Sequence, residues 1–501
     1  MKDLANQVNE KYGHYPKEQR IYALYEAYHD YAHECQNTAT SYLKSYSYTY
    51  TSMWASNMVA IKDADAECVS KLEAMADVVS ITPDTVVPLA PINVEPLTTG
   101  DNADSTKFRW GYTWGLSKIN VMDAWQFGYG GYQYGHQGKL LKGEGVTVGT
   151  IDTGVRATHE AIRDSYRGYK GWADGYQLSK TPEDLMGHGT HTMGTIVGTH
   201  GIGVAPGAQW ISCRGCFIED CTFSALLFCC QWILCPYNTS TSSGPKHYKD
   251  CYYAPDLVSN SWGGEANDTT FDRCILSLQA AGIIPIWANG NAGPDCGTAN
   301  SPGNNPNVIA VGATAQDDGL ASFSSRGPSF FNATNKPDIS APGVDTISAF
   351  MASDTSYALM SGTSMATPHI AGVVTLMLQR CRLPYKIVLN ILESTAEKFL
   401  GTTKQVCGGT PADKFPNNFY GYGRVDALEA VKKAAAYCKL HSYANQAASY
   451  GSANNGYTFV QVPHSPLHSL YSQLLQPVHQ YSQNQHQQYS YQHLQPTSGV
   501  Y

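Results

Sequence analysis

Between residues 113 and 437, short apolar segments alternate with stretches of helical length, and this alternation restricts the possible folds more than any other feature. VTVGTI (146–151) and VIAVGAT (308–314) have the length and β-branched content of buried strands, whereas FSALLFCCQWIL (223–234) is long enough for a helix. Strands separated by helices pair in parallel, and both faces of such a sheet are covered. We therefore predict an α/β domain over 113–437, with a mainly parallel central sheet and helices on both faces.

A smaller α+β unit is predicted for residues 1–84. IYALYEAYHDYAHE (21–34) and ADAECVSKLEAMA (64–76) have helical patterns, and VVSITPD (78–84) has the composition of a short strand. Residues 85–112 are rich in proline, threonine and aspartate, and this composition predicts an exposed linker to the larger domain.

The last part of the chain, 438–501, has a different composition. It consists largely of Gln, Tyr, Ser and His, with almost no charged or branched aliphatic residues. Such a segment cannot bury enough apolar surface to fold, so we predict a disordered or self-associating low-complexity tail.

Charge and hydropathy exclude two kinds of partner. The 501 residues carry a formal net charge of −8 without a basic block, which argues against nucleic acid as the main partner. No uninterrupted apolar run approaches the roughly 20 residues that span a bilayer, so no membrane span is expected.

Fourteen cysteines are many for a chain of this length, and six of them fall within 213–235. Disulfides and a zinc site are both compatible with such a cluster. The histidine and cysteine spacing of a zinc module is absent, so we favour disulfides; the sequence does not determine their pairing.

Disulfides indicate an oxidising compartment, and the N-x-S/T motifs at Asn238, Asn267 and Asn332 agree with a secreted protein or one in the secretory or vacuolar pathway. No signal peptide is visible, because the first twenty residues contain no apolar core, and we expect the natural start to lie upstream.

Three polar residues stand in glycine-rich motifs at the ends of predicted elements. Asp152 follows the strand VTVGTI, His188 lies in GHGTHTMG before a helix, and Ser364 opens the apolar helix of SGTSMATPHIAG. A serine hydroxyl becomes nucleophilic when a neutral imidazole takes its proton, and a carboxylate orients that imidazole. The three residues therefore predict a nucleophilic triad.

Other readings of these motifs fit less well. An aspartic protease needs two carboxylates, but DTG occurs only once; an α/β-hydrolase needs G-x-S-x-G and the order Ser, Asp, His. A zinc pair favours HExxH, whereas His188 and His191 are three residues apart without a glutamate between them.

The motifs together resemble the subtilisin-like serine proteases, or subtilases. IDTG, HGTHTMGTIVG, VSNSWGG, ANGNAG, KPDISAPGV and SGTSMATPHIAG match that family over about 113–437. QWILCP followed by APDLVSNSWGG is similar to the bacillopeptidase F-like branch, and residues 40–84 resemble the inhibitory propeptide of the family.

The resemblance assigns roles to matching residues. It implies that Asp152 stabilises His188, that His188 acts as general base and then general acid, and that Ser364 attacks the scissile carbonyl. Asn291 in ANGNAG would donate its side-chain amide to the oxyanion, and His191 would be a structural helix residue.

The resemblance also implies two walls of a pocket for the residue before the cleaved bond (P1), with the substrate backbone added as a strand. These walls are Ser261, Trp262, Gly263 and Gly264 on one side, and Ala288, Asn289 and Gly290 on the other. The indole of Trp262 makes one wall bulky and neither segment is acidic, so we predict an apolar or aromatic P1 residue.

The expected protein is thus a self-processed serine endopeptidase that acts on proteins or peptides, with its own propeptide as intramolecular inhibitor. The chemistry requires no cofactor; structural calcium is common in the family, but no metal ligand can be assigned. Two alternatives are a catalytically silent binding scaffold, which the intact motifs disfavour, and a structural protein of an extracellular wall whose function lies in the tail.

Overall fold

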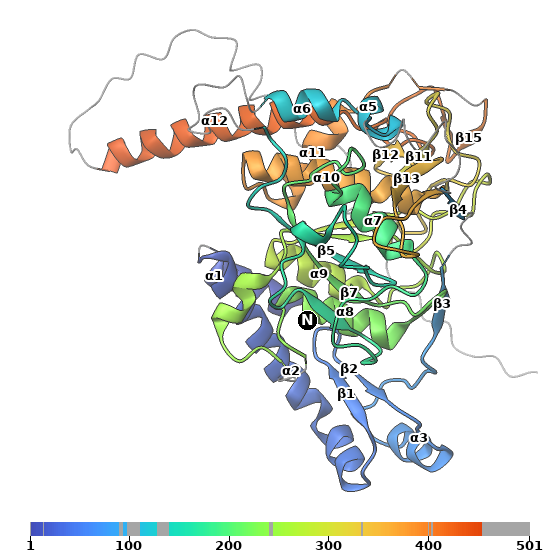
Figure 1. The fold of residues 1–501 in the computed structure, drawn as a ribbon. Coiled ribbons are helices and arrows are strands. Elements are labelled where there is room, and N and C mark those ends of the chain that lie inside the picture. The colour runs from blue at the N-terminus through green and yellow to red at the C-terminus, as the bar shows by residue number, and fades with distance from the viewer. Residues whose placement is uncertain are drawn as a thin grey trace, which may run out of the picture. The chain divides into compact units, whose positions relative to one another are not determined.

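The computed structural model describes residues 2–13, 15–89, 94–97, 111–127, 140–239, 244–331, 334–398, 400–401 and 404–452. The chain divides into two compact units, Met1–Leu440 and His441–Tyr501. Figure 1 shows the arrangement of the elements of the first unit.

A seven-stranded sheet forms the centre of the first unit, and all of its pairings are parallel. In spatial order its strands are β12 (Ile339–Pro342), β11 (Ile309–Thr314), β10 (Ile284–Ala288), β9 (Leu257–Asn260), β5 (Thr147–Asp152), β7 (Gln209–Arg214) and β6 (Trp172–Asp174). The predicted parallel sheet is confirmed.

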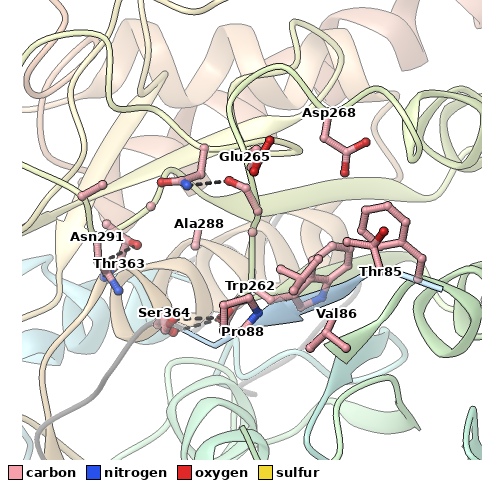
Figure 2. A pocket seen from close by; sticks show the side chains of 18 of the residues that line it. Thr85, Val86, Pro88, Trp262, Glu265, Asp268, Ala288, Asn291, Thr363 and Ser364 are labelled. Atoms are coloured by element: carbon pink, nitrogen blue, oxygen red, sulfur yellow. Dashed lines mark hydrogen bonds between the residues drawn. The ribbon is translucent and has the colours of Figure 1, made fainter. Parts of the chain in front are cut away.

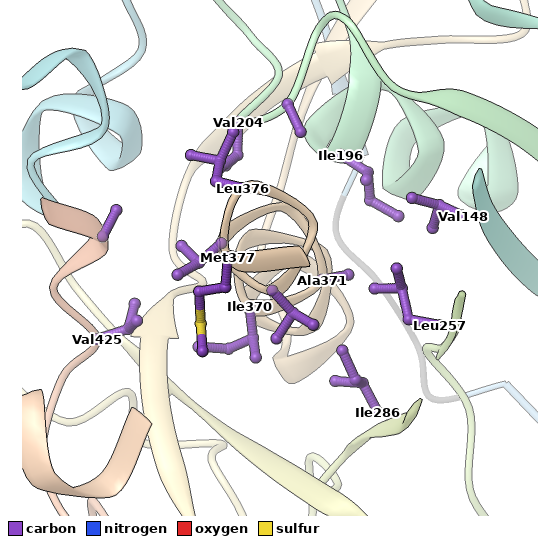
Figure 3. Close-up of a cluster of buried hydrophobic side chains, with 14 of the residues drawn as sticks. Val148, Ile196, Val204, Leu257, Ile286, Ile370, Ala371, Leu376, Met377 and Val425 are labelled. Carbon is purple, nitrogen blue, oxygen red and sulfur yellow. The ribbon is translucent and has the colours of Figure 1, made fainter. Parts of the chain in front are cut away.

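Helices cover both faces, as predicted. On one face lie α7 (His188–Val197) and α10 (Thr363–Arg380), and on the other lie α8 (Phe223–Leu234) and α9 (Asp272–Ala281). Each strand contributes side chains to the hydrophobic cores on both faces of the sheet, because successive side chains of a strand point to opposite faces. Ile286 packs in the core around α10, which Figure 3 shows, and its neighbour Trp287 packs in the core with α8 and α9.

Further elements belong to the larger domain. They are α5 (Trp114–Lys118), α6 (Val121–Phe127), η1 (Arg163–Ser165), β8 (Asp220–Thr222), η2 (Tyr248–Tyr253), β13 (Thr346–Ala349), β14 (Tyr357–Met360), α11 (Tyr385–Thr395), β15 (Val406–Cys407) and β16 (Thr410–Pro411).

The N-terminal segment forms α1 (Lys2–Tyr12), α2 (Lys17–Ser45), the hairpin of β1 (Tyr50–Met53) and β2 (Met58–Ile61), and α3 (Ala66–Glu73). The expectation of a strand at 78–84 is wrong: these residues are irregular. The segment shares a core with the larger domain, where Leu24, Tyr28 and Trp54 pack in the same cluster as residues of α8 and α9.

Part of the segment predicted to be an exposed linker is instead paired with the larger domain. β3 (Val86–Pro88) pairs antiparallel with β8, and β4 (Val94–Pro96) pairs antiparallel with β14. Val87 and Leu89 are 4% and 8% exposed. Burial of these apolar side chains against the domain is favourable in free energy. The proline-, threonine- and aspartate-rich composition of the segment did not indicate this burial. Residues 90–93 and 98–110 of this segment lie outside the described part.

Helix α12 (Ala427–Ser452) extends past the predicted start of the tail at residue 438. Its sequence AVKKAAAYCKL is rich in strong helix formers, which explains the extension. The remainder of the predicted tail, 453–501, lies outside the described residues. No helix in the described ranges is both long and apolar enough to cross a membrane.

Six disulfides account for twelve of the cysteines, while Cys35 and Cys68 are free thiols. The pairs are Cys213–Cys229, Cys216–Cys221, Cys230–Cys274, Cys235–Cys251, Cys296–Cys407 and Cys381–Cys438. The cysteine cluster therefore forms disulfides, four of them around β7, α8 and η2.

Candidate active site

Asp152 and His188 are in direct contact. Asp152 is the last residue of β5 and His188 the first of α7, and His188 Nδ1 lies 2.6 Å from Asp152 Oδ1. Both side chains are almost fully buried. The carboxylate also accepts hydrogen bonds from the backbone N–H of Thr153 at 2.7 Å and from Thr192 Oγ1 at 3.2 Å, so its orientation is fixed from three directions.

A second carboxylate, that of Asp184, ties the end of β5 to the start of α7. Its Oδ1 accepts from Thr153 Oγ1 at 2.9 Å and from Gly187 N at 2.8 Å, and its Oδ2 accepts from the N–H and hydroxyl of Thr190. Thr153 Oγ1 in turn accepts from Gly189 N. Asp184 therefore caps the helix that carries His188 and holds it against the residue next to Asp152.

Two opposing influences act on the pKa of His188. Burial alone would lower this pKa, but the charge and hydrogen bond of Asp152, together with the charge of Asp184, raise it above the usual value. The bond from Nδ1 to a carboxylate selects the tautomer whose Nε2 is unprotonated, so Nε2 can accept a proton.

Ser364 lies in the first turn of α10, which packs directly against α7. Its Oγ donates to the carbonyl of Ser261 at 3.0 Å, and Ser261 Oγ donates to the carbonyl of Ser364 at 3.0 Å. Within the described part of the chain, His188 Nε2 has no hydrogen-bond partner. The Ser364 hydroxyl is thus bonded to Ser261 and not to His188, and catalytic hydrogen bonds often tighten only when substrate binds.

The side-chain amide of Asn291 is oriented by Thr363. The N–H and hydroxyl of Thr363 both donate to Asn291 Oδ1, at 2.9 and 2.8 Å. Two donors on one side identify that atom as the oxygen, so Nδ2 points the other way. A Cβ added to Gly362 would lie 3.3 Å from this Nδ2 and 3.5 Å from Ser364 N, which places both donors around one small volume.

A cavity of about 740 Å³ opens beside Ser364. Figure 2 shows Ser364, Thr363 and Asn291 toward one end of it and Thr85 toward the other, with Trp262 between them. Residues 85–88, which include β3, form one of its borders.

Most of the predicted pocket residues line this cavity, namely Ser261, Trp262, Gly263, Gly264, Ala288 and Gly290. Asn289 does not line it: the residue is fully buried and its Nδ2 donates to Ser325 O at 2.7 Å, behind the wall. The indole of Trp262 is also fixed by a hydrogen bond, in which its Nε1 donates to Ile151 O at 3.0 Å.

Sequence reasoning missed other lining residues, among them Phe223, Glu265, Asp268 and Asn300. Glu265 directly follows the predicted wall SNSWGG and Asp268 comes three residues later, so an extended reading of that segment could have found them. Asn300, in TANSPGNNP, is brought to the cavity only by tertiary packing.

The other buried histidines have structural contacts. His191 Nε2 lies 3.0 Å from Thr346 O and 3.1 Å from Ala358 O, and burial lowers its pKa to about 3. His369 Nδ1 lies 2.8 Å from Met365 O, and burial lowers its pKa to about 4. Both side chains are therefore neutral framework residues near neutral pH. Burial also lowers the pKa of His159, which contacts Ser356 O.

Comparison with known proteins agrees with this geometry. A family model described as the subtilase family matches residues 143–423. The chain is 35% identical over 345 residues to Bacillopeptidase F of Bacillus subtilis (strain 168), which covers 64% of this chain and 22% of that protein. It is 32% identical to Serine protease AprX of the same organism, over 59% of this chain and 68% of AprX. It is 30% identical to Thermitase of Thermoactinomyces vulgaris, over 64% and 95%. The chain thus spans about a fifth of Bacillopeptidase F but nearly all of Thermitase.

Proposed function

This chain belongs to the subtilase family of serine proteases, and from that membership we propose that it hydrolyses peptide bonds through Asp152, His188 and Ser364. The observation that carries the assignment is the 2.6 Å contact between His188 Nδ1 and the buried Asp152 carboxylate. It lies at the start of a helix that packs on the helix bearing Ser364.

The proposed reaction proceeds in two halves. As Ser364 Oγ bonds to the scissile carbonyl carbon, its proton passes to His188 Nε2, which then gives it to the leaving amine as the C–N bond breaks. Water then attacks the acyl carbon while His188 takes a proton from it. As the bond from the acyl carbon to Ser364 Oγ breaks, His188 gives that proton to Oγ, and the acid product leaves. Asp152 stabilises the imidazolium formed in each half.

Two donors would stabilise the oxyanion of each tetrahedral intermediate. Asn291 Nδ2 and the backbone N–H of Ser364 surround the volume next to Gly362. The start of α10 adds a partial positive charge in the same place. Because Thr363 already holds Asn291 Oδ1, the amide need not reorganise when negative charge develops.

The test is labelling with a fluorophosphonate, followed by intact-mass and peptide analysis, on the wild type and Ser364→Ala expressed in an oxidising compartment. We expect one adduct, on Ser364, in the wild type and none in the variant. A folded wild type that takes no label even after its N-terminal segment has been removed would instead favour the binding-scaffold alternative.

We further propose that the chain is a zymogen whose N-terminal segment blocks the cleft. Two observations support this proposal. Val86, Val87 and Pro88 border the cavity that contains Ser364, and they are held as a strand on β8. β4, later in the same segment, pairs with β14, whose last residue, Met360, precedes Ser364 by four residues.

The disulfides support an oxidising compartment, and we propose secretion or passage through the secretory or vacuolar pathway.

Catalysis in the family needs no cofactor. Structural calcium stays an expectation of the family: within the described ranges, no group of three or more His, Cys, Asp or Glu could hold a metal ion. No step of the proposed reaction uses one.

A further inference from the structure

Asn267 lies at the border of the cavity beside Ser364. It begins the sequon Asn267-Asp268-Thr269, a tripeptide of the kind that accepts N-linked oligosaccharides in the secretory pathway. Asn267 is one of the cavity-lining residues, and both it and Thr269 are exposed. The fold therefore places an accessible acceptor for a glycan next to the proposed substrate site.

The backbone around Asn267 is held by hydrogen bonds. Asp268 N donates to Glu265 O at 3.2 Å, which makes Ala266 and Asn267 the central residues of a β-turn. Asn304 Nδ2 donates to the carbonyl of Ala266 at 2.6 Å. An exposed side chain on a hydrogen-bonded turn gives a glycan a fixed point of attachment, so the bulk of the glycan would stay at this border of the cavity.

Figure 2 shows which part of the cavity this border belongs to. Asp268, the neighbour of Asn267 in the sequence, lies toward the Thr85 end of the cavity, and Ser364 lies toward the other end. Residues 85–88 border the cavity from the Thr85 end toward Ser364. A substrate chain that takes the place of residues 85–88 would therefore pass the glycan.

A glycan at this place would exclude large substrates more than small ones, because N-linked oligosaccharides are bulky and lie on the protein surface. A flexible chain needs little width and can enter the cavity past the glycan. A folded protein must bring the surface on both sides of its cleavage site against the border of the cavity, and the glycan would occupy that space. A short peptide that reaches only the Ser364 end does not pass Asn267.

We propose that Asn267 is an N-glycosylation site whose glycan restricts the cavity to flexible chains and short peptides and excludes folded proteins. This inference rests on the proposed hydrolysis at Ser364 and on the proposed secretory route. In the modification, the amide nitrogen of Asn267 bonds to the anomeric carbon of an oligosaccharide that is carried on a lipid pyrophosphate. The bond from this carbon to the pyrophosphate oxygen breaks, the lipid pyrophosphate leaves, and the amide loses one proton; nothing is oxidised or reduced.

Two other residues of the sequons provide matched controls. Asn238 is exposed as well, but it does not line the cavity, so a glycan there should not affect the choice of substrate. Thr269 does not line the cavity either, so its side chain can be changed without altering the lining. Thr269→Ser keeps the sequon, whereas Thr269→Ala removes it. The third sequon asparagine, Asn332, lies outside the described residues.

The experiment compares the wild type, Thr269→Ala, Thr269→Ser and Asn238→Gln, each expressed as the full chain through a eukaryotic secretory pathway. Glycopeptide mass analysis should find Asn267 occupied in every protein except Thr269→Ala.

Activity is then measured after removal of the N-terminal segment, with active sites counted by fluorophosphonate labelling. The substrates are a blocked dipeptide p-nitroanilide, native ribonuclease A, and the same ribonuclease kept unfolded by reduction and carboxymethylation. We expect Thr269→Ala to raise kcat/KM on the native protein by about tenfold, within the range over which association rates of related complexes vary. The dipeptide and the unfolded protein should be cleaved at the same rate by all four proteins.

The outcomes separate this inference from the proposed hydrolysis. If Asn267 carries no glycan, or if Thr269→Ala and the wild type cleave native ribonuclease A equally, the inference is overturned while the hydrolase stands. An equal rise in Thr269→Ser would also overturn it, since that variant keeps the glycan. If Thr269→Ala does not fold, the wild type treated with peptide N-glycosidase decides. If no protein is labelled at Ser364, the proposed hydrolysis fails and the restriction of substrates fails with it.

Discussion

At the scale of single residues, the protonation state of His188 depends on two carboxylates that lie at different positions. Asp152 contacts the imidazole directly, whereas Asp184 acts through its charge and through the helix cap at Thr190. Both raise the pKa of His188 against the effect of burial. A base must be neutral to accept a proton, so a raised pKa moves the acidic limb of activity to higher pH.

Asp184→Asn should therefore move that limb to lower pH, because it removes a negative charge that favours the imidazolium. The new amide N–H₂ would face donors at Thr190, so kcat on the plateau should also fall, by about tenfold. The measurement is the pH profile of kcat/KM, with Asp164→Asn as control, since Asp164 is exposed. An unmoved limb with a lower plateau would show that Asp184 has a structural role only.

Asn291→Ala should lower kcat by about 10² to 10³ with little change in KM, because the amide is aimed at charge that appears only in the transition state. The magnitude comes from removal of the equivalent type of donor in subtilisin. Steady-state kinetics on one peptide substrate check this, with Asn307→Ala as the matched control. If KM rose by that factor instead and kcat did not fall, the oxyanion role would be contradicted.

At the scale of elements, β3 is the part of the N-terminal segment that reaches the cavity. Val87 is 4% exposed, and a Cβ on Gly264 would lie 3.4 Å from its side chain. The rest of the segment is fastened elsewhere, for example by Lys17 Nζ, which lies 3.0 Å from Asp256 Oδ1. The proposed blocking of the site therefore falls on a different element from those contacts.

Val87→Asp should speed the labelling of Ser364 in the uncleaved chain, because a buried carboxylate without a partner destabilises the β3–β8 pair. Time-resolved intact mass distinguishes the labelled full-length chain from processed forms. Val79→Asp is the control, since Val79 is 99% exposed and should leave the rate unchanged. Equal labelling rates for both variants and the wild type would argue against a blocking role for β3.

At the scale of the whole molecule, disulfides connect parts of the chain that are distant in sequence. Cys296–Cys407 spans 111 residues and joins the loop after Asn291 to the β15–β16 hairpin. A link across such a long loop removes much conformational entropy from the unfolded chain.

Replacing both Cys296 and Cys407 by serine should lower the free energy of unfolding by about 2 to 5 kcal/mol. Denaturant unfolding measures this in a Ser364→Ala background, where self-digestion is prevented. Cys35→Ser, which removes an exposed free thiol, should have no measurable effect. A double replacement as stable as this control would show that the bridge is dispensable.

The sequence by itself determined the features that depend on local order. The period of apolar residues predicted the parallel sheet and its helices, and glycine-rich turns at element ends predicted that Asp152 and His188 would meet. Such signals lie within a dozen residues, where backbone propensity and side-chain period act directly. The tertiary structure decided what distant segments do together: the cysteine pairing, the packing of β3 on β8, and the place of Asn300 in the lining of the cavity. These contacts depend on which surfaces bury one another when the whole chain is compact, and no local pattern encodes that choice.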